Sequence, residues 1–278
     1  MKFAICNEMF QDRPLGKVFG FAAECGYAGI ELAPFTVAPY VTEIPADRRR
    51  GIRRQAEQAG VEIVGLHWLL AKTEGFHLTS ADAGVRRATA EYLGELARFC
   101  ADLGGRVLVF GSPDQRNLQP GVARDEANGH AAEVIRAAVP ILVETGVTLA
   151  MEPLGPEWTD FLRNADETVE LVRMIDSDRV RLHLDCRAMS SESSSAPELI
   201  HAHRHRLAHF HVNDPNGQGP GFGELDLVPI LRALDEIGYD DWVSVETFDY
   251  SPGAERLARG SIEYLRGCLA KISQQNQE

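Results

Sequence analysis

One short pattern recurs along the chain: a helical stretch ends in a glycine, and a short apolar segment follows within a few residues. The five glycines of this pattern are Gly26, Gly60, Gly104, Gly146 and Gly238. A glycine just past a helix supplies the left-handed conformation that closes the last turn, so each one predicts a return from helix to strand. Strands that alternate with helices pair in parallel, because each helix carries the chain back across the sheet.

Eight strands and eight helices are predicted. The strands are expected at 2–6, 28–32, 61–66, 106–110, 147–152, 179–185, 207–212 and 242–246. The helices are expected at 14–25, 46–59, 84–103, 123–145, 165–175, 196–204, 226–237 and 253–271. Eight such units close into an α/β fold of the (β/α)8 TIM-barrel type, which typically needs about 250 residues. We therefore expect a single domain over residues 1–278.

A doubly wound open sheet is the alternative fold. It predicts a glycine-rich phosphate-binding loop after the first strand. This chain has no glycine there, because it continues from Cys6 to Phe10 as Cys-Asn-Glu-Met-Phe. The barrel is therefore favoured.

Composition narrows the possible partners and location. The 28 Lys and Arg against 41 Asp and Glu give a formal charge of −13, which argues against nucleic acid as a partner. No signal peptide or long apolar run is present, and the five scattered cysteines contain no C-x-x-C pair. We expect a cytoplasmic protein with no membrane partner. A homo-oligomer stays possible.

The fifth to eighth predicted strands each end in a residue that can bind a metal. These residues are Glu152, Asp185, His211 and Glu246, and successive members are 26 to 35 residues apart. One eighth of a barrel occupies roughly 31 residues, so the four side chains are expected at the same height in their units.

Alternation along the strands indicates which way these side chains point, since residues two apart share a face. On the fifth strand, Met151 is expected to face the helices and Glu152 the barrel interior. On the seventh strand, Ala208 and Phe210 are assigned to the outer face, which leaves His211 inside. The eighth strand gives the same result, so the four residues should meet at the C-terminal mouth.

Three carboxylates gathered in a barrel mouth repel one another unless a cation neutralises them. The set therefore predicts one divalent metal ion. Oxygen-rich ligands with one imidazole suit Mn²⁺, Mg²⁺ or Co²⁺, and Zn²⁺ is possible. The alternative is that the four are unrelated polar groups at strand ends, paired with arginines of the barrel.

Several stretches resemble one known family. They are Met151-Glu152-Pro153-Leu154, His183-Leu184-Asp185, and the segments 209–214, 219–226 and 238–246. These match the sugar isomerase/epimerase superfamily of xylose isomerase-like barrels, which includes ketose 3-epimerases, hydroxypyruvate isomerases, inosose isomerases and dehydratases, and endonuclease IV. The match is close in the C-terminal half, while the N-terminal half is similar mainly in the spacing of its predicted strands.

The resemblance implies that the four residues bind one ion, and that Glu152 and Glu246 also act as acid and base. Proton transfer through a metal-stabilised enediolate then gives epimerisation or isomerisation, depending on the carbon that is reprotonated. The chain departs from the epimerase pattern at Ala188, Gly217 and Trp158. The metal-binding core is therefore kept, whereas the residues that hold the sugar differ.

Four further residues are candidates for binding substrate. His67 could hold a hydroxyl and Trp68 could cover a sugar face, unless the two simply pair within their loop. Arg116 could bind a carboxylate or phosphate, with an ordinary surface loop as the alternative. Glu157 lies one position before the place where the epimerases carry a glutamate.

Three buried candidates are predicted around the ligands. His183 and His209 should face the interior one layer below, as supporting or core histidines. Glu31 ends the second strand and could either face the substrate pocket or pair with a barrel arginine.

The leading hypothesis is a metal-dependent isomerase or epimerase of a small sugar or keto-polyol. The main alternative is a metal-dependent dehydratase, a lyase acting on an inosose or dehydroshikimate-type substrate. An abasic-site nuclease is disfavoured by the charge of −13. A non-catalytic barrel that serves as a binding or assembly subunit is the remaining alternative.

Overall fold

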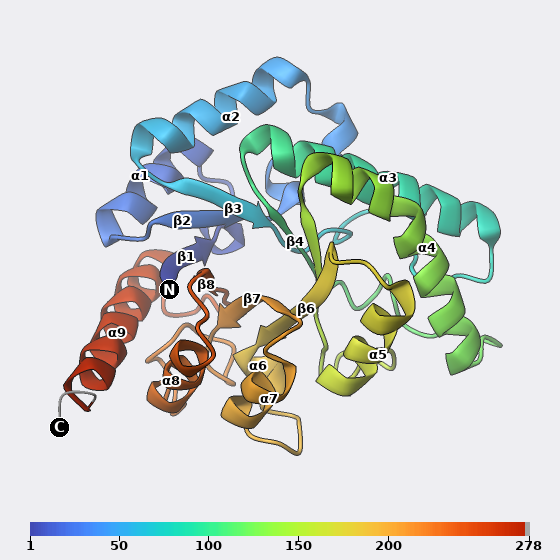
Figure 1. Cartoon of the computed structure of the whole chain (residues 1–278). Helices are drawn as coiled ribbons and strands as arrows, with labels where there is room; N and C mark the ends of the chain where they lie inside the picture. Colours follow the sequence, from blue (N-terminus) through green and yellow to red (C-terminus); the bar gives the residue numbers. More distant parts are fainter. Residues whose placement is uncertain (276–278) are drawn as a thin grey trace.

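The protein forms a closed barrel of eight parallel strands in the order β1 to β8, as seen in a computed structural model that describes residues 1–275 (Figure 1). The strands are β1 (Lys2–Cys6), β2 (Gly29–Leu32), β3 (Glu62–Leu66), β4 (Val107–Phe110), β5 (Thr148–Met151), β6 (Val180–Asp185), β7 (Leu207–Val212) and β8 (Trp242–Val245). The ring closes where β8 pairs with β1, with Val243 opposite Phe3. The predicted (β/α)8 fold is confirmed, and the open doubly wound sheet is excluded.

All eight predicted helices are present. The helices are α1 (Leu15–Cys25), α2 (Ala46–Ala59), α3 (Ala83–Leu103), α4 (Arg124–Thr145), α5 (Ala165–Ile175), α6 (Cys186–Met189), α7 (Ala196–His203), α8 (Val228–Glu236) and α9 (Ala254–Gln275). The additional helix, α6, is a single turn directly after β6, and it is too short to leave a periodic signal in the sequence. Three short 3-10 helices, Glu8–Phe10, Pro34–Thr36 and Val41–Glu43, follow β1 and β2.

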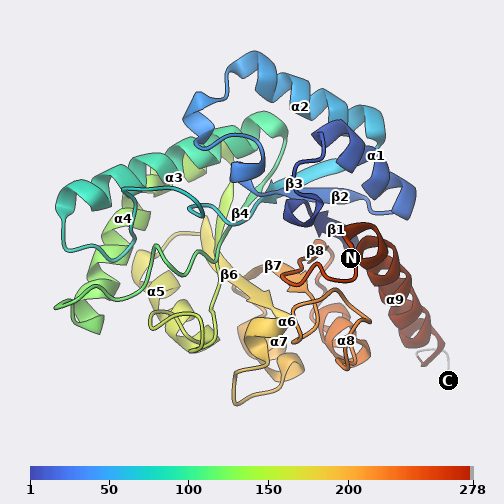
Figure 2. The same ribbon diagram turned by 180° about the vertical axis from the view of Figure 1, so that it is seen from behind.

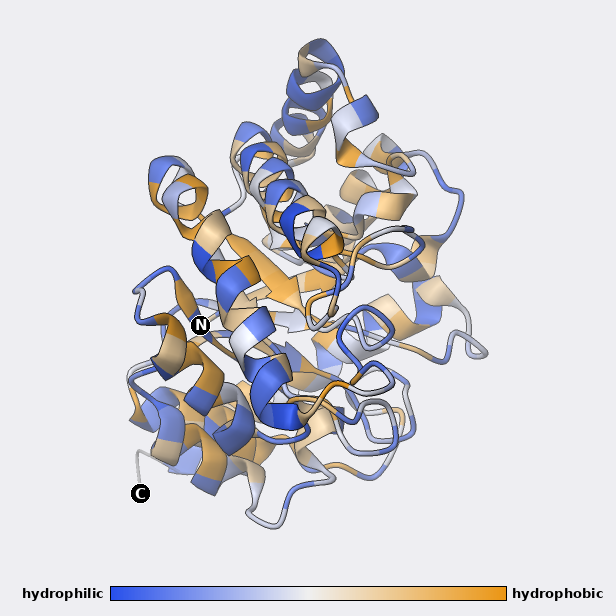
Figure 3. Cartoon of the chain, turned by 90° about the vertical axis from the view of Figure 1, so that its right-hand side faces the viewer, coloured by the Kyte–Doolittle hydropathy of each residue, from blue (hydrophilic) through white to orange (hydrophobic). Residues whose placement is uncertain are grey.

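The helices surround the barrel in chain order. Successive helices from α1 to α5 and from α7 to α9 contact one another, and α9 contacts α1 beside the β1–β8 seam (Figures 1 and 2). Apolar residues lie on the strands and on the helix faces turned toward them, whereas polar residues cover the outside (Figure 3). Within residues 1–275, no helix combines the length and apolar character needed to cross a bilayer.

The glycine pattern corresponds to helix ends. Gly26, Gly60, Gly104 and Gly146 are the left-handed C-caps of α1 to α4. Gly238 is also left-handed but lies one residue beyond Ile237, the C-cap of α8. At these positions a residue with a Cβ would be strained, so the glycines set the points at which the chain turns back to the barrel.

The strand residues point toward the barrel interior or toward the helices as predicted, with one exception. Met151 and Phe210 pack in the large core between strands and helices, while Ala150 belongs to a small cluster inside the barrel. Ala208 is the exception, since it packs against this inner cluster and not on the outer face. The register between β6 and β7 shifts at this point, and such a bulge turns a side chain to the opposite face.

Candidate active site

The structure brings together the four residues singled out as metal ligands. Glu152 and Glu246 directly follow β5 and β8, Asp185 ends β6, and His211 lies near the end of β7. One ligand atom from each lies within 4.8 Å of the others, and all four side chains are buried. The backbone register explains this convergence, because His211 lies opposite Asp185 on one side and Ser244 on the other.

The charges of the cluster are unfavourable in the absence of a cation. Burial, followed by the charges of Glu246 and Asp185, raises the pKa of Glu152 well above its ordinary value. Burial and then Glu246 raise the pKa of Asp185 to about 6. Burial would also raise the pKa of Glu246, but the nearby His211 outweighs it and lowers that pKa. Three buried carboxylates and one imidazole therefore form a donor set that fits a divalent ion.

Asp185 is held by hydrogen bonds on both of its oxygens. Oδ1 accepts from the backbone N–H of Ala188 at 2.9 Å, so Asp185 is also the N-cap of α6. Oδ2 accepts from Nδ2 of Asn213 at 2.6 Å. Asn213 belongs to a motif noted in the sequence, but its contact with Asp185 depends on the pairing of β6 with β7.

Glu31 forms hydrogen bonds with two histidines across the barrel. It does not line the cavity, and no arginine of the described residues pairs with it. Its Oε2 lies 3.2 Å from Nε2 of His211, and its Oε1 lies 2.5 Å from Nε2 of His209. Burial alone would raise the pKa of Glu31, but the two imidazoles lower it well below its ordinary value. Nδ1 of His211 is then left facing Glu246 Oε2 at 3.0 Å. A carboxylate behind a histidine in this way is typical of metal-ligating histidines.

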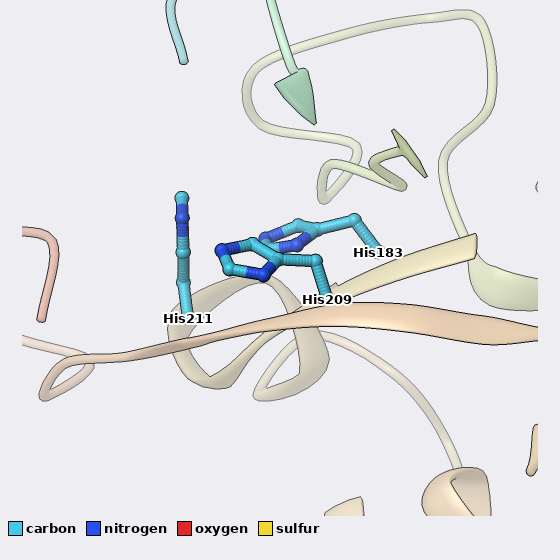
Figure 4. A group of neighbouring side chains, drawn as sticks. All are labelled: His183, His209 and His211. Atoms are coloured by element: carbon cyan, nitrogen blue, oxygen red, sulfur yellow. The ribbon is translucent and has the colours of Figure 1, made fainter. Parts of the chain in front are cut away.

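His183 and His209 lie beneath the carboxylates, next to the ligand His211. Figure 4 shows His209 and His211 on one strand and His183 reaching in from the neighbouring one. The ring of His183 stacks on His209 at 5.5 Å between centroids and meets the edge of His211 at 4.2 Å. Burial and the two neighbouring imidazoles lower the pKa of His183 well below its usual value. His183 is buried beneath the ligands, where the sequence predicts a supporting or core histidine.

His67 pairs with a residue that sequence reasoning missed. Its Nε2 lies 2.8 Å from Oε2 of Glu8, and both side chains are buried. Burial would lower the pKa of His67, but Glu8 raises it. Besides the four-residue cluster, the described residues contain two further groups of possible ligand atoms, one of Cys6, Glu31 and His67 and one of the three histidines beneath and beside the carboxylates. Glu8 gives no periodic signal because it lies in a 3-10 turn after β1.

A cavity of about 330 Å³ opens above the cluster. Both glutamates line it, together with His67 and Trp68. The indole Nε1 of Trp68 donates to Oε1 of Glu246 at 2.7 Å. The backbone of Trp68 is left-handed, with φ of 53°, and such strain in a bulky residue is typical of functional sites.

Two predicted substrate-binding residues do not line this cavity. Arg116 is fully buried, and its Nη1 donates to the backbone carbonyl of Glu152 at 2.6 Å. Burial lowers the pKa of Arg116 to about 10. Glu157 is exposed in the loop after β5. Arg116 therefore supports the strand end that carries Glu152, and it is not a residue of an ordinary surface loop.

Other residues around the cavity were not singled out as substrate-binding. Arg187, Phe248 and Asp114 line it, and so does Trp158, which the sequence marks only as a departure from a pattern. Arg187 lies beside Asp185 in the chain, but a lone arginine after a strand carries no specific signal.

The chain has relatives among known proteins. A family model described as a xylose isomerase-like TIM barrel matches residues 19–268. An L-ribulose 3-epimerase of Mesorhizobium japonicum is 27% identical over 183 residues, which cover 66% of this chain and 61% of that relative. A probable ketose 3-epimerase of Synechocystis sp. is 23% identical over 285 residues, covering 96% of each chain.

Solved structures share the fold. A D-psicose 3-epimerase with D-tagatose from Clostridium cellulolyticum superposes with a TM-score of 0.85 over 97% of this chain and 99% of that one. The two sequences are 20% identical, so this likeness concerns the fold alone.

Proposed function

Because the chain belongs to the xylose isomerase-like TIM-barrel family, we propose that it is a divalent-metal-dependent isomerase or epimerase of a small sugar or keto-polyol. The observation that carries this proposal is the convergence of Glu152, Asp185, His211 and Glu246, three of which, the carboxylates, line one cavity. The names of the relatives, an L-ribulose 3-epimerase and a probable ketose 3-epimerase, support the same reaction class.

The four converging residues would hold the ion, with Mn²⁺, Mg²⁺ and Co²⁺ favoured by the oxygen-rich donor set and Zn²⁺ possible. When bound, the ion would supply a Lewis acid that polarises the substrate carbonyl and offsets the charge of an enediolate. His211 is oriented for this task by Glu31, and Asp185 by Asn213.

Glu152 and Glu246 would move the proton. They reach the cavity from β5 and β8, so they approach a bound substrate from different parts of the ring. One glutamate removes the proton next to the carbonyl, and the other returns a proton. Return to the opposite face of the same carbon is epimerisation, and return to the former carbonyl carbon is isomerisation. Trp68 holds Glu246 in place through its indole N–H.

A dehydratase is the second candidate. Ala188 is buried beside the cavity and residue 217 is a glycine, so neither position offers a polar side chain to hold a sugar hydroxyl. The same two glutamates could then remove a proton and let a β-hydroxyl leave as water.

One experiment tests the proposal and separates it from the dehydratase. Metal-loaded protein is incubated in D₂O with a panel of ketoses, keto-inositols and dehydroshikimate, and the products are followed by NMR. Deuterium on carbon without loss of water is the expected result. An enone product would identify a lyase instead. No reaction across the panel would contradict both candidates.

Gly111→Ala should damage the site by displacing Glu152. A Cβ at position 111 would collide with Oε2 of the Glu152 carboxylate. Because a misplacement of about 1 Å can cost roughly 10²-fold in rate, we expect turnover to fall by about that factor. The matched control is Gly129→Ala, where nothing lies within 4 Å of the added Cβ. Equal turnover in the two variants would contradict the role given to Glu152.

Glu31→Gln should weaken metal binding, although Glu31 is not one of the four metal ligands. A neutral amide cannot balance the two histidines that Glu31 now contacts, and changes behind a metal ligand typically cost about 10–100-fold in affinity. Competition with a chromogenic chelator measures this affinity. Glu62→Gln is the control, because Glu62 is exposed at the start of β3 and pairs only with exposed Lys2. An unchanged metal affinity in Glu31→Gln would contradict the proposal that Glu31 orients His211.

A further inference from the structure

Arg187 presents its charge to the cavity between two aromatic rings. It lies in α6, and its guanidinium carbon is 4.6 Å from the Trp158 ring and 4.9 Å from the Phe248 ring. All three residues line the cavity above the carboxylate cluster. Aromatic faces hold a guanidinium by its plane and leave the N–H groups at its edge for a ligand.

This guanidinium is not paired with any carboxylate of the described residues. No carboxylate among residues 1–275 lies within 4.0 Å of the Arg187 nitrogens. Its Nε is buried and forms no hydrogen bond to any described residue. Lys72, the other cation lining the cavity, likewise has no ion pair in this part of the chain, and its Nζ lies 4.1 Å from the Phe35 ring. A guanidinium at a cavity wall that has no carboxylate partner among the described residues can pair with an anionic group of a ligand.

Small neighbours leave room around Arg187. A Cβ added at Gly217 would lie 3.7 Å from Nη1 of Arg187, so the guanidinium occupies the space next to this glycine. Ala188 lines the same part of the cavity with a single methyl group. Gly217 and Ala188 therefore lie beside Arg187 and add no polar side chain to this part of the molecule.

We propose that Arg187 binds an oxyanion of the substrate, a carboxylate or a phosphate, at the end of the molecule away from the reacting carbonyl. This inference rests on the proposed function and names the substrate class for the same site. A guanidinium matches two oxygens of one oxyanion through parallel N–H donors. In the proposed reaction the floor takes up the carbonyl and its neighbouring hydroxyl, so the anionic end of the substrate is left for Arg187 at the wall of the cavity.

Binding measurements test this without requiring turnover. The metal-loaded protein is titrated by calorimetry with fructose, gluconate and fructose 6-phosphate. We expect gluconate or fructose 6-phosphate to bind at least tenfold more tightly than fructose, and the better of the two identifies the oxyanion. Arg187→Met should abolish this preference and leave the affinity for fructose unchanged. Arg50→Met, at an exposed position in α2, should keep the preference.

The outcomes separate this inference from the function itself. A wild-type protein that binds fructose as tightly as both anions would overturn it, and so would an Arg187→Met variant that weakens all three ligands equally. If the protein turns over neutral ketoses but binds the anionic ligands no more tightly than fructose, the isomerase proposal stands and the role of Arg187 is rejected. If Arg187→Met does not fold, as judged by circular dichroism, Arg187→Lys replaces it, and loss of the two-oxygen contact should still reduce the preference.

Discussion

Glu246→Gln is expected to lower turnover by about 10²–10⁴-fold in protein that remains folded, because general acid–base catalysis typically contributes that much. Glutamine keeps the shape of the side chain and can still accept the hydrogen bond from Trp68. It cannot take up a proton from carbon. The rate of deuterium incorporation from D₂O, measured at saturating metal, reports this step directly.

Glu152→Gln should give a loss of the same order, since the reaction needs both an acceptor and a donor of the proton. Glu170→Gln is the matched control, because Glu170 is exposed on α5. Metal content is measured on every variant, so that loss of the ion is separated from loss of the proton-transfer group. A glutamine variant that holds metal and exchanges deuterium at the wild-type rate would contradict the assignment.

Removal of the metal has the second large expected effect, on both activity and stability. Ethylenediaminetetraacetate should abolish turnover and lower the melting temperature. An ion present at 100 times its dissociation constant stabilises the folded state by about 2.7 kcal/mol. At roughly 2–4 °C per kcal/mol for a chain of this size class, the midpoint should fall by about 5–11 °C.

The ligand cluster provides the control for this experiment. Asp185→Asn should lose most of the metal-dependent shift, because it removes one of three carboxylates from the donor set. Differential scanning calorimetry with and without Mn²⁺ measures the shift in both proteins. A wild-type midpoint that does not respond to Mn²⁺, Mg²⁺, Co²⁺ or Zn²⁺ would reject the site.

Local sequence rules were sufficient to predict the fold and the residues at the floor of the cavity. Helix-ending glycines and apolar strands are short-range signals, and parallel pairing then brings the C-terminal ends of β5 to β8 to one mouth. Alternation failed at Ala208, because a bulge between β6 and β7 is not encoded in a two-residue period.

The residues around the floor depend on contacts that sequence spacing does not reveal. Glu31 contacts His209 and His211 across the barrel, at separations of 178 and 180 residues. Arg116 follows β4, but its side chain is buried and donates a hydrogen bond to the backbone carbonyl of Glu152, at the end of β5. The position of Arg187 between Trp158 and Phe248 depends on the short helix α6 and on the loops that follow β5 and β8, whose conformations follow from packing and not from any local pattern.

Closure of the ring between β1 and β8 has a consequence for the order of folding events. The seam joins Lys2 to Trp242, so it forms only after almost the whole chain has been brought together, which is slow. Glu31, which orients His211, lies on the far side of this seam. The ligand set together with the carboxylate that orients His211 therefore exists only in a nearly native barrel. A bound ion is expected to lengthen the lifetime of the folded state by slowing unfolding, with little effect on the rate of folding.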